Sequence, residues 1–238
     1  MEAILLAGGK AERLGEAARG LPKPLVPVAG RPIAMHQTAL LVAAGVARVI
    51  VSCAAGTGEL FERELSGMGA EIVPVEEPVP LGRGGGLRLA ARERRESAPV
   101  LALNGDELVD LDLAALVARH RAGAPAATIT VAPLQSAFGV VDVADDDVVT
   151  GFREAPRLPF WVSCGVYVLD EEAVARLPER GDHETSTFPA LAAEGRLRAF
   201  RHEGVWITVN TPKDLRRAEE FLAANPDRLR PRTTDATL

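Results

Sequence analysis

The chain has 238 residues, enough for one large α/β domain or two small ones, and its 47% hydrophobic and 25% charged content is typical of globular proteins. Its net charge of −6 argues against nucleic acid as the main partner, because no excess of basic residues is available to neutralise a phosphate backbone. The sequence contains no apolar run of about 18 residues, the length that would predict a membrane span. The first residues also lack the pattern of a signal peptide. We therefore expect no membrane partner and a cytoplasmic location.

The first half of the chain alternates strand-like apolar runs with helical segments. Strands are predicted at 3–7, 48–53, 70–75 and 100–103. Helices are predicted at 33–44, 60–66, 85–96 and 111–122. Strands that alternate with helices form βαβ units, so we expect a mostly parallel sheet covered by helices on both faces.

The pattern changes near residue 125, where strand-like runs follow one another with few helices between them. These runs lie at 126–131, 139–143, 148–153 and 162–169. They predict strands added to the sheet and a small subdomain that forms the other wall of a cleft. Beyond them, a strand-like stretch is expected at 198–209, and helices at 171–177, 187–193 and 212–224. We therefore expect a single domain over 1–224 and a flexible tail over 225–238.

Cysteine and histidine do not suggest a metal or redox site. Cys53 and Cys164 are the only cysteines, and they stand far apart in apolar runs. This usage excludes a disulfide framework and a zinc site, and favours two small buried residues. The four histidines show no ligand spacing and are interpreted as non-catalytic.

A glycine pair ends the first predicted strand and opens a cationic loop. Gly8 and Gly9 leave backbone N–H groups open to close approach by an anion. Arg13 offers a planar fork for phosphate oxygens, and Lys23, held between two prolines, offers a point charge. The glycines alone could form a tight turn, and they match neither the dinucleotide fingerprint nor the P-loop. With the two cations, they indicate a grip for a nucleoside triphosphate.

This stretch, Leu-Ala-Gly-Gly-Lys-Ala-Glu-Arg-Leu followed by Pro-Lys-Pro-Leu, resembles the signature of the sugar-1-phosphate nucleotidyltransferases, or NDP-sugar pyrophosphorylases. Later motifs extend the resemblance over nearly the whole chain, in a short form without a C-terminal β-helix. The resemblance implies a Rossmann-like three-layer α/β/α sandwich with a mixed, mainly parallel sheet. It also implies nucleotidyl transfer from an NTP to a sugar 1-phosphate, with release of pyrophosphate. Residues 1–124 would then bind the nucleotide and 125–224 the sugar phosphate.

The family pattern assigns catalytic roles to Arg13, Lys23 and Asp106. Arg13 would hold the β- and γ-phosphates, and Lys23 would bridge the α-phosphate and the incoming phosphate. The residues expected at the nucleotide are Leu6, Ala7, Gly8, Gly9, Lys10, Glu77, Gly82, Asn104 and Gly105.

Two turns are the candidates for a Mg²⁺ site. Asp106 follows the strand at 100–103, where a carboxylate can hold Mg²⁺ against triphosphate oxygens; the alternative is an ordinary Asn-Gly turn. The family's second ligand is an Asp where this chain has Thr208, but Asn210 lies two residues on, the same side of an extended strand. Related uridylyltransferases for aminosugars use a Val-Asn there, so Asn210 is the expected second ligand. The alternative is that Asn210 and Thr211 only cap the last helix.

The loop from Glu77 to Gly86 resembles the family's base-binding loop, with Pro-Val inserted and Arg83 where Thr is common. Gly82 would let the backbone approach the base. Glu77 can only accept hydrogen bonds, and guanine offers two adjacent donors where uracil and thymine offer one. This favours GTP; the alternative for Glu77 is a solvated loop carboxylate.

The sugar-phosphate side matches the family less completely. Gly139 belongs to an aromatic-Gly-Val segment, Glu154 is the candidate acceptor for sugar hydroxyls, and Gly165 would leave room for the sugar. The family's phosphate-binding Lys is Ala155 here, and Arg157 or Arg153 is the expected substitute.

Three other functions compete with the transferase. A catalytically weak, nucleotide-sugar-binding regulatory subunit is suggested by Ala155 and Thr208. A cytidylyl- or molybdopterin-type nucleotidyltransferase shares the glycine loop. An NAD-dependent oxidoreductase fits the strand pattern, but this sequence lacks the fingerprint glycines of that class.

The expected partners are an NTP and a sugar 1-phosphate. The sugar and the oligomeric state stay open, with a homodimer as one alternative.

Overall fold

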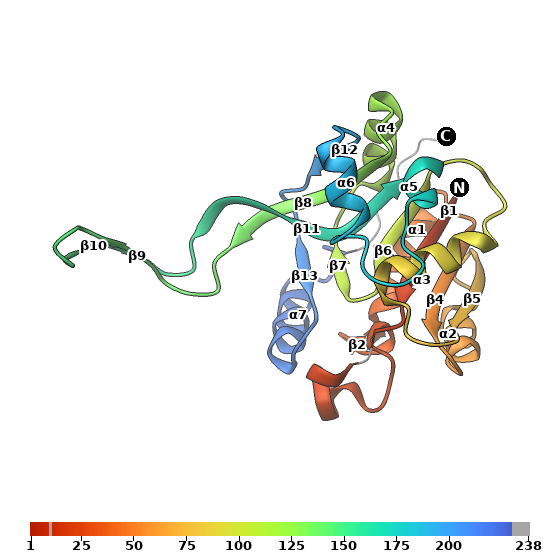
Figure 1. Ribbon diagram of the computed structural model, residues 1–238. Coiled ribbons are helices and arrows are strands. Elements are labelled where there is room, and N and C mark those ends of the chain that lie inside the picture. Colours follow the sequence, from red (N-terminus) through yellow and green to blue (C-terminus); the bar gives the residue numbers. More distant parts are fainter. Residues whose placement is uncertain (10, 230–238) are drawn as a thin grey trace.

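A seven-stranded sheet with the order β12-β8-β11-β6-β1-β4-β5 forms the centre of the computed structural model, which describes residues 1–9 and 11–229 (Figure 1). Its strands are β1 (Glu2–Ala7), β4 (Arg48–Ala54), β5 (Glu71–Glu77), β6 (Val100–Asn104), β8 (Ala127–Gln135), β11 (Arg157–Leu169) and β12 (Leu197–Arg201). The pairs β1–β4, β4–β5, β1–β6 and β8–β12 are parallel, and only β11 runs antiparallel to its neighbours β6 and β8. The predicted mixed, mainly parallel sheet is confirmed.

Alternation along β1 shows why helices cover both faces of this sheet. Ala3, Leu5 and Ala7 pack into one hydrophobic cluster, whereas Ile4 and Leu6 pack into the other. The first cluster includes residues of α1 (Ile33–Ala43), α2 (Gly58–Leu65) and α4 (Leu113–Gly123). The second includes residues of α3 (Gly82–Ala90), α5 (Glu171–Ala175) and α6 (Thr187–Ala193). The three-layer α/β/α sandwich is therefore confirmed.

A third hydrophobic cluster joins the short elements beside the sheet to the last helix. It includes residues of η1 (Glu12–Ala18), β2 (Pro27–Val28), β7 (Glu107–Val109), β13 (Trp206–Thr208) and α7 (Pro212–Ala224). The short elements η2 (Lys23–Leu25) and β3 (Arg31–Pro32) flank β2 in the sequence. A further 3-10 turn, η3 (Ala91–Glu93), ends α3 earlier than predicted. The single strand expected at 198–209 is wrong. It divides into β12 and β13 because Asp110 accepts a hydrogen bond from the Val205 amide at 2.6 Å and turns the chain there.

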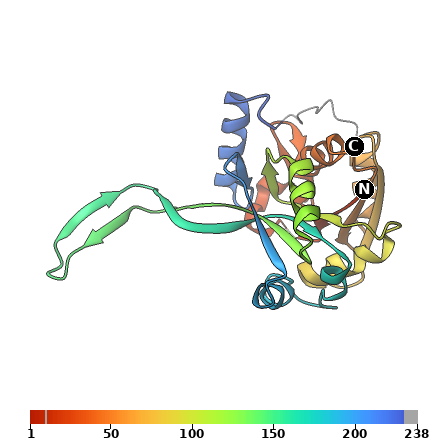
Figure 2. The ribbon, with the colours of Figure 1, turned by 90° about the horizontal axis from the view of Figure 1, so that it is seen from above.

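The strands near residues 140–153 form an arm instead of the expected cleft wall. β9 (Val140–Val143) and β10 (Val149–Arg153) pair only with each other, and the outer parts of β8 and β11 carry this hairpin away from the body (Figures 1 and 2). We call residues 133–161 the arm. The alternation of apolar and polar residues predicted these strands. It does not predict the direction in which a two-stranded ribbon leaves the sheet.

The cysteines and the helix lengths also bear on what the sequence predicts. Cys53 and Cys164 are both free and buried, as predicted. Over the described part of the chain, no helix has the length and apolar character needed to cross a bilayer. Most of the expected tail, residues 230–238, and Lys10 lie outside the described residues.

Candidate active site

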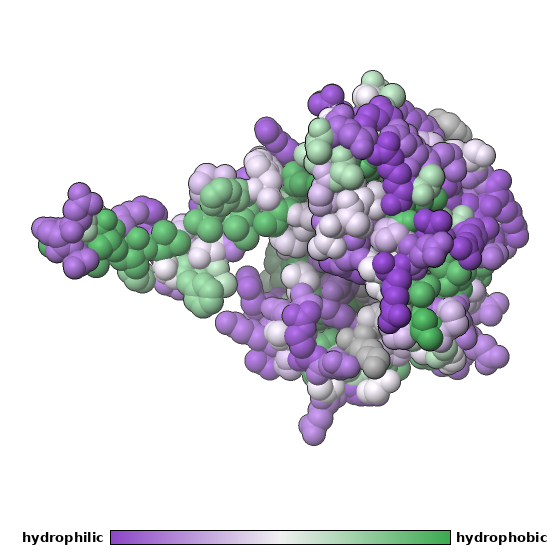
Figure 3. All heavy atoms as spheres, viewed as in Figure 1, coloured by the Kyte–Doolittle hydropathy of each residue, from purple (hydrophilic) through white to green (hydrophobic). Residues whose placement is uncertain are grey.

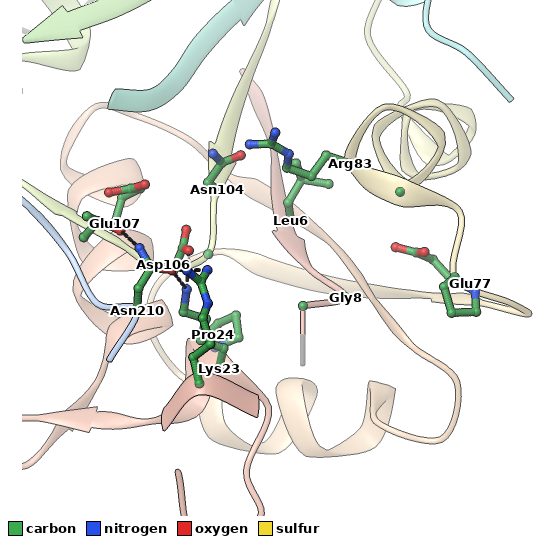
Figure 4. A pocket seen from close by; sticks show the side chains of 16 residues that line it. Leu6, Gly8, Lys23, Pro24, Glu77, Arg83, Asn104, Asp106, Glu107 and Asn210 are labelled. Atoms are coloured by element: carbon green, nitrogen blue, oxygen red, sulfur yellow. Dashed lines mark hydrogen bonds and ion pairs between the residues drawn. The ribbon is translucent and has the colours of Figure 1, made fainter. Parts of the chain in front are cut away.

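A cavity of about 600 Å³ opens where β1, β5 and β6 end. Ligands of open parallel sheets bind at this edge, beyond the carboxyl ends of the strands. The cavity is shown in Figure 4, and its lining consists of Leu6, Gly8, Gly9, Arg13, Lys23, Pro24, Glu77, Pro80, Gly82, Arg83, Asn104, Gly105, Asp106, Glu107, Thr208 and Asn210. Most of the residues predicted to bind the nucleotide therefore meet in one place. Among the predicted residues that the structure describes, Ala7 is the exception, because it is buried in the hydrophobic core.

The cationic side of the cavity brings together four predicted residues from three distant parts of the sequence. Lys23 Nζ donates to Asp106 Oδ2 at 2.5 Å and to Asn210 Oδ1 at 2.6 Å (Figure 4). Arg13 Nη2 donates to the same Asn210 oxygen at 2.9 Å. Lys23 is only 8% exposed, because η2 and its flanking prolines hold it against the body. We call Arg13, Lys23, Asp106 and Asn210 the cationic wall.

The orientation of the Asn210 side chain shows that this residue does more than cap the last helix. Asn210 Nδ2 donates to Thr208 Oγ1 at 2.7 Å, which turns its oxygen toward Lys23 and Arg13. The cap of α7 is supplied by Thr211, whose hydroxyl and backbone form a capping box with Asp214. Thr208 thus orients the amide instead of supplying a carboxylate.

The oxygens of the cationic wall suit a hard divalent cation. Asp106 Oδ2 and Asn210 Oδ1 already converge on one positive charge, the Lys23 ammonium. Carboxylate and amide oxygens are ligands of Mg²⁺, which is usually held by one or two such groups together with substrate phosphates and water. Among residues 1–9 and 11–229, no cluster of three or more His, Cys, Asp or Glu side chains could hold a metal alone. The residues fit a Mg²⁺ ion that shares its coordination with a phosphate.

Gly105 lets the loop after β6 lie close to β1 and η2. Its amide donates to the Leu6 carbonyl at 2.9 Å, and a Cβ at this position would stand 2.6 Å from Pro24 Cγ. Real Cβ atoms do not approach this closely, so the position requires glycine. The turn thereby places Asp106 beside Lys23.

Glu107 is a lining residue that the sequence reasoning missed. Its side chain is buried, and Oε2 accepts a hydrogen bond from Trp206 Nε1 at 2.7 Å. Burial, followed by the neighbouring charge of Asp106, raises the pKa of the Glu107 carboxyl well above its ordinary value. A second acidic residue directly after Asp106 was the only signal in the sequence.

Glu77 closes the opposite end of the cavity, and it is buried instead of solvated. Its two oxygens accept hydrogen bonds from Ser52 Oγ at 3.1 Å and the Leu81 amide at 2.9 Å. A Cβ on Gly8 would stand 2.7 Å from Glu77 Oε1, so glycine is needed for this contact. Each carboxylate oxygen retains a second lone pair for a ligand. Gly82, with φ +78°, begins α3 beside it and lines the cavity.

Arg83 adds a cation that sequence reasoning did not assign to the site. Its side chain lines the cavity together with Leu6 (Figure 4). Arg83 Nε donates to Asp182 Oδ2 at 2.8 Å, and Nη2 lies 2.7 Å from Glu184 Oε2. The departure from the family's Thr was visible in the sequence, but its two carboxylate partners lie about a hundred residues away.

The residues predicted for the sugar phosphate are divided between the body and the arm. Gly165, with φ +69°, lies against the cavity wall, because a Cβ there would stand 2.7 Å from Asn104 Nδ2. Gly139, Glu154 and Arg157 belong to the arm and do not line the cavity. Arg157 instead lies 3.6 Å from Glu203. Their roles at the sugar stay predictions.

Comparisons with known proteins show the family of the chain. A family model described as "Nucleotidyl transferase" matches residues 2–225. The mannose-1-phosphate guanylyltransferase of Mycobacterium tuberculosis is 33% identical over 234 residues, which cover 93% of this chain and 64% of that protein. The mannose-1-phosphate guanylyltransferase catalytic subunit beta of Xenopus tropicalis is 32% identical, over 90% of this chain and 62% of that protein. The chain thus spans about three-fifths of the length of these curated relatives.

Solved structures share the fold at low sequence identity. HddC from Yersinia pseudotuberculosis has a TM-score of 0.72 at 21% identity, over 93% of this chain and 99% of that chain. A putative glucose-1-phosphate thymidylyltransferase from Bacillus anthracis has a TM-score of 0.74 at 18% identity, over 100% of this chain and 97% of that chain.

Proposed function

Because the chain belongs to the nucleotidyl transferase family, we propose that it transfers a nucleotidyl group from an NTP to a sugar 1-phosphate and releases pyrophosphate. The observation that carries the proposal is the cationic wall, where Lys23 and Arg13 converge on the oxygens of Asp106 and Asn210. GTP and mannose 1-phosphate are the proposed substrates, since the curated relatives over at least 90% of this chain are named as mannose-1-phosphate guanylyltransferases.

The reaction needs alignment of two anions and neutralisation of charge, with no covalent enzyme intermediate. An oxygen of the sugar phosphate attacks the α-phosphorus in line, and pyrophosphate leaves on the opposite side. Arg13, exposed at the edge of the cavity, holds the β- and γ-phosphates and stabilises the departing pyrophosphate. Lys23 lies between the α-phosphate and the incoming phosphate. Asp106 and Asn210 would hold Mg²⁺, which supplies charge neutralisation between the two anions.

The glycine loop and the Glu77 end of the cavity are proposed to hold the nucleoside. Asn104 Oδ1 is buried and accepts no hydrogen bond from the described residues, although it belongs to a cavity-lining side chain. A buried acceptor of this kind is normally satisfied, and a rotation of the Asn104 amide would be needed to present it to a ribose hydroxyl or a base N–H. Glu77, with acceptors only, favours the two adjacent donors of guanine.

The sugar phosphate requires a cation that the family pattern places at Ala155. We assign this role to Arg83, because it lines the cavity, whereas Arg157 lies on the arm beside Glu203. Asp182 and Glu184 hold the guanidinium in a defined position, which reduces the entropy lost when it binds a phosphate.

The proposal includes assembly as a homodimer and a cytoplasmic location. Two free, buried cysteines and an NTP substrate support a reducing compartment. Gly139, Glu154 and Arg157 keep their proposed roles at the sugar only if the arm reaches a cavity.

A pyrophosphate-release panel tests the proposed reaction. Each of GTP, UTP, dTTP and CTP is mixed with Mg²⁺ and with mannose, glucose or heptose 1-phosphate, and pyrophosphate is measured continuously. Release that is fastest with GTP and mannose 1-phosphate supports the proposal. Nucleotide binding without pyrophosphate from any pair would contradict it, and would favour the nucleotide-sugar-binding subunit instead.

A further inference from the structure

The arm carries nearly all of the exposed large hydrophobic side chains of the described residues. Of nine such residues, eight lie on the arm and only Val79 lies elsewhere. Figure 3 shows these hydrophobic residues along the projecting arm. The eight are Phe138, Val141, Val143, Val148, Val149, Phe152, Phe160 and Trp161. Contiguous exposed apolar surface of this kind marks an interaction site.

Strand register collects part of this surface on one face of the hairpin. Val141 is opposite Phe152, and Val143 is opposite Val149, so the four side chains point to the same side. The opposite face carries Asp142 and Arg153, which form an ion pair at 2.6 Å, together with Val140 and Gly151. The hairpin is therefore an amphipathic two-stranded ribbon. Such a ribbon is at best marginally stable in water unless its apolar face is covered.

The body offers no matching surface for this face. Among the described residues outside the arm, Val79 is the one exposed large hydrophobic side chain. Packing the arm against its own body, or against the body of another copy, would thus set apolar groups against polar ones. Among the described residues, the exposed large hydrophobic side chains that match the arm are therefore those of another arm.

We propose that the arm is the interface of a two-fold dimer, in which its apolar face packs against the same face of a second copy. Covering all eight exposed aromatic and valine side chains of the arm would bury roughly 600–800 Å² per chain, close to the ~800 Å² per partner of a standard-size interface. A two-fold axis across the ribbons makes them antiparallel, so the contact is isologous and closed.

Charges along the arm favour this antiparallel arrangement. The hairpin turn carries Asp145, Asp146 and Asp147, whereas Arg157 and Arg201 flank Trp161 at the base of the arm, 6.0 and 5.1 Å from its ring. In an antiparallel pair, the acidic turn of one copy faces the basic end of the other. The same three carboxylates would be the first groups to enter a membrane, which argues against lipid as the partner.

Sedimentation equilibrium of the full chain without substrates tests the interface. This inference extends the homodimer of the proposed function and uses none of its chemistry, so the pyrophosphate assay can fail while the dimer stands, and the reverse. Val143→Asp should weaken dimerisation about a hundredfold, because each chain would then bury one carboxylate in the apolar contact. Val79→Asp is the matched control, since the two valines are 59% and 52% exposed, and it should leave the dissociation constant unchanged.

A second substitution guards against a folding defect in the first. Val143→Ser removes apolar surface without adding charge and should weaken the dimer about tenfold, with the thermal midpoint of the body unchanged. A wild-type chain that stays monomeric up to about 100 μM would overturn the proposal, since a standard-size interface is tighter than this. Equal weakening by Val79→Asp, or an unaltered dimer in both Val143 variants, would also overturn it.

Discussion

The cationic wall and the arm are both built from residues of the same family pattern, but only the wall is assembled in the structure. Arg13, Lys23, Asp106 and Asn210 meet within hydrogen-bond distance, although they are up to 197 positions apart. Gly139 and Glu154 lie on a ribbon whose hairpin pairs only with itself. Buried parallel strands impose one path on the wall, because any other path would expose the core. A two-stranded ribbon has no such constraint, so a motif on it does not determine where its side chains lie.

The largest effect is expected at the wall. Lys23→Ala should lower kcat/KM for pyrophosphate release about a thousandfold, because it removes the charge between the two phosphates. Lys213→Ala, an exposed lysine on α7, is the control and should stay within about twofold. Near-normal turnover of the Lys23 variant would contradict the proposed role of the cationic wall in the reaction.

The glycine turn that positions Asp106 should affect stability next most strongly. Gly105→Ala should lower the free energy of unfolding by about 2–3 kcal/mol, because its Cβ meets Pro24 and the Leu6 backbone. Gly9→Ala is matched, since a Cβ there meets no described atom within 4 Å. Urea unfolding compares the two, and an equal loss in both variants would show that the close approach at Gly105 is not the cause.

The stability of the body should also depend on pH, because the body contains a buried histidine. His183 is fully buried between the rings of Tyr167 and Phe188, and burial lowers its pKa from 6.5 to about 4. In the unfolded chain the His183 imidazole is protonated below pH 6.5, whereas in the folded chain it is protonated only below about pH 4. Stability should therefore fall by roughly 2–3 kcal/mol as the pH is lowered through this window.

Urea unfolding at several pH values measures this loss. His183→Phe keeps a ring of similar shape and should flatten the profile between pH 4 and 6.5. An unchanged slope in that variant would assign the effect to other groups.

A smaller effect should decide which arginine replaces the missing lysine at position 155. Arg83→Ala should raise the KM for the sugar 1-phosphate about tenfold, because one charged contact to a phosphate is lost. Arg157→Ala, on the arm, should change it less than about twofold. The reverse order of effects would place the arm at the sugar.

The smallest effect is expected at Glu154, which the family pattern assigns to sugar hydroxyls. Glu154→Gln should change kcat/KM by less than about threefold, because the side chain does not line the cavity. A tenfold rise in the KM for the sugar phosphate would show that the arm reaches a cavity.

Most of the fold could be predicted because its signals are local. Alternation of apolar runs gave the strands, and the Pro212–Ala224 helix was predicted with its observed bounds, since Thr211 and Pro212 are strong start signals. The residues of the wall were predicted from the resemblance of the glycine loop, the Pro-Lys-Pro segment and the turn at Asp106 to the family pattern. The orientation of Asn210 was left open, because its hydrogen bond to Thr208 is a three-dimensional feature.

Other parts of the site depend on contacts that no local pattern contains. Arg83 became a cavity residue through Asp182 and Glu184, which come from a loop beyond β11. Glu107 is buried by Trp206 from β13, which was expected to be one strand with β12. The course of the arm depends on what covers its apolar face, and the proposed cover is a second chain.

Hydrogen exchange of the wild-type chain, with and without GTP and Mg²⁺, tests the contrast between wall and arm most directly. We expect slower exchange of the backbone amides at 6–9, 81–86 and 104–107, where the loops line the cavity, and no change at 139–154. Protection at 139–154 without protection of the glycine loop would contradict it.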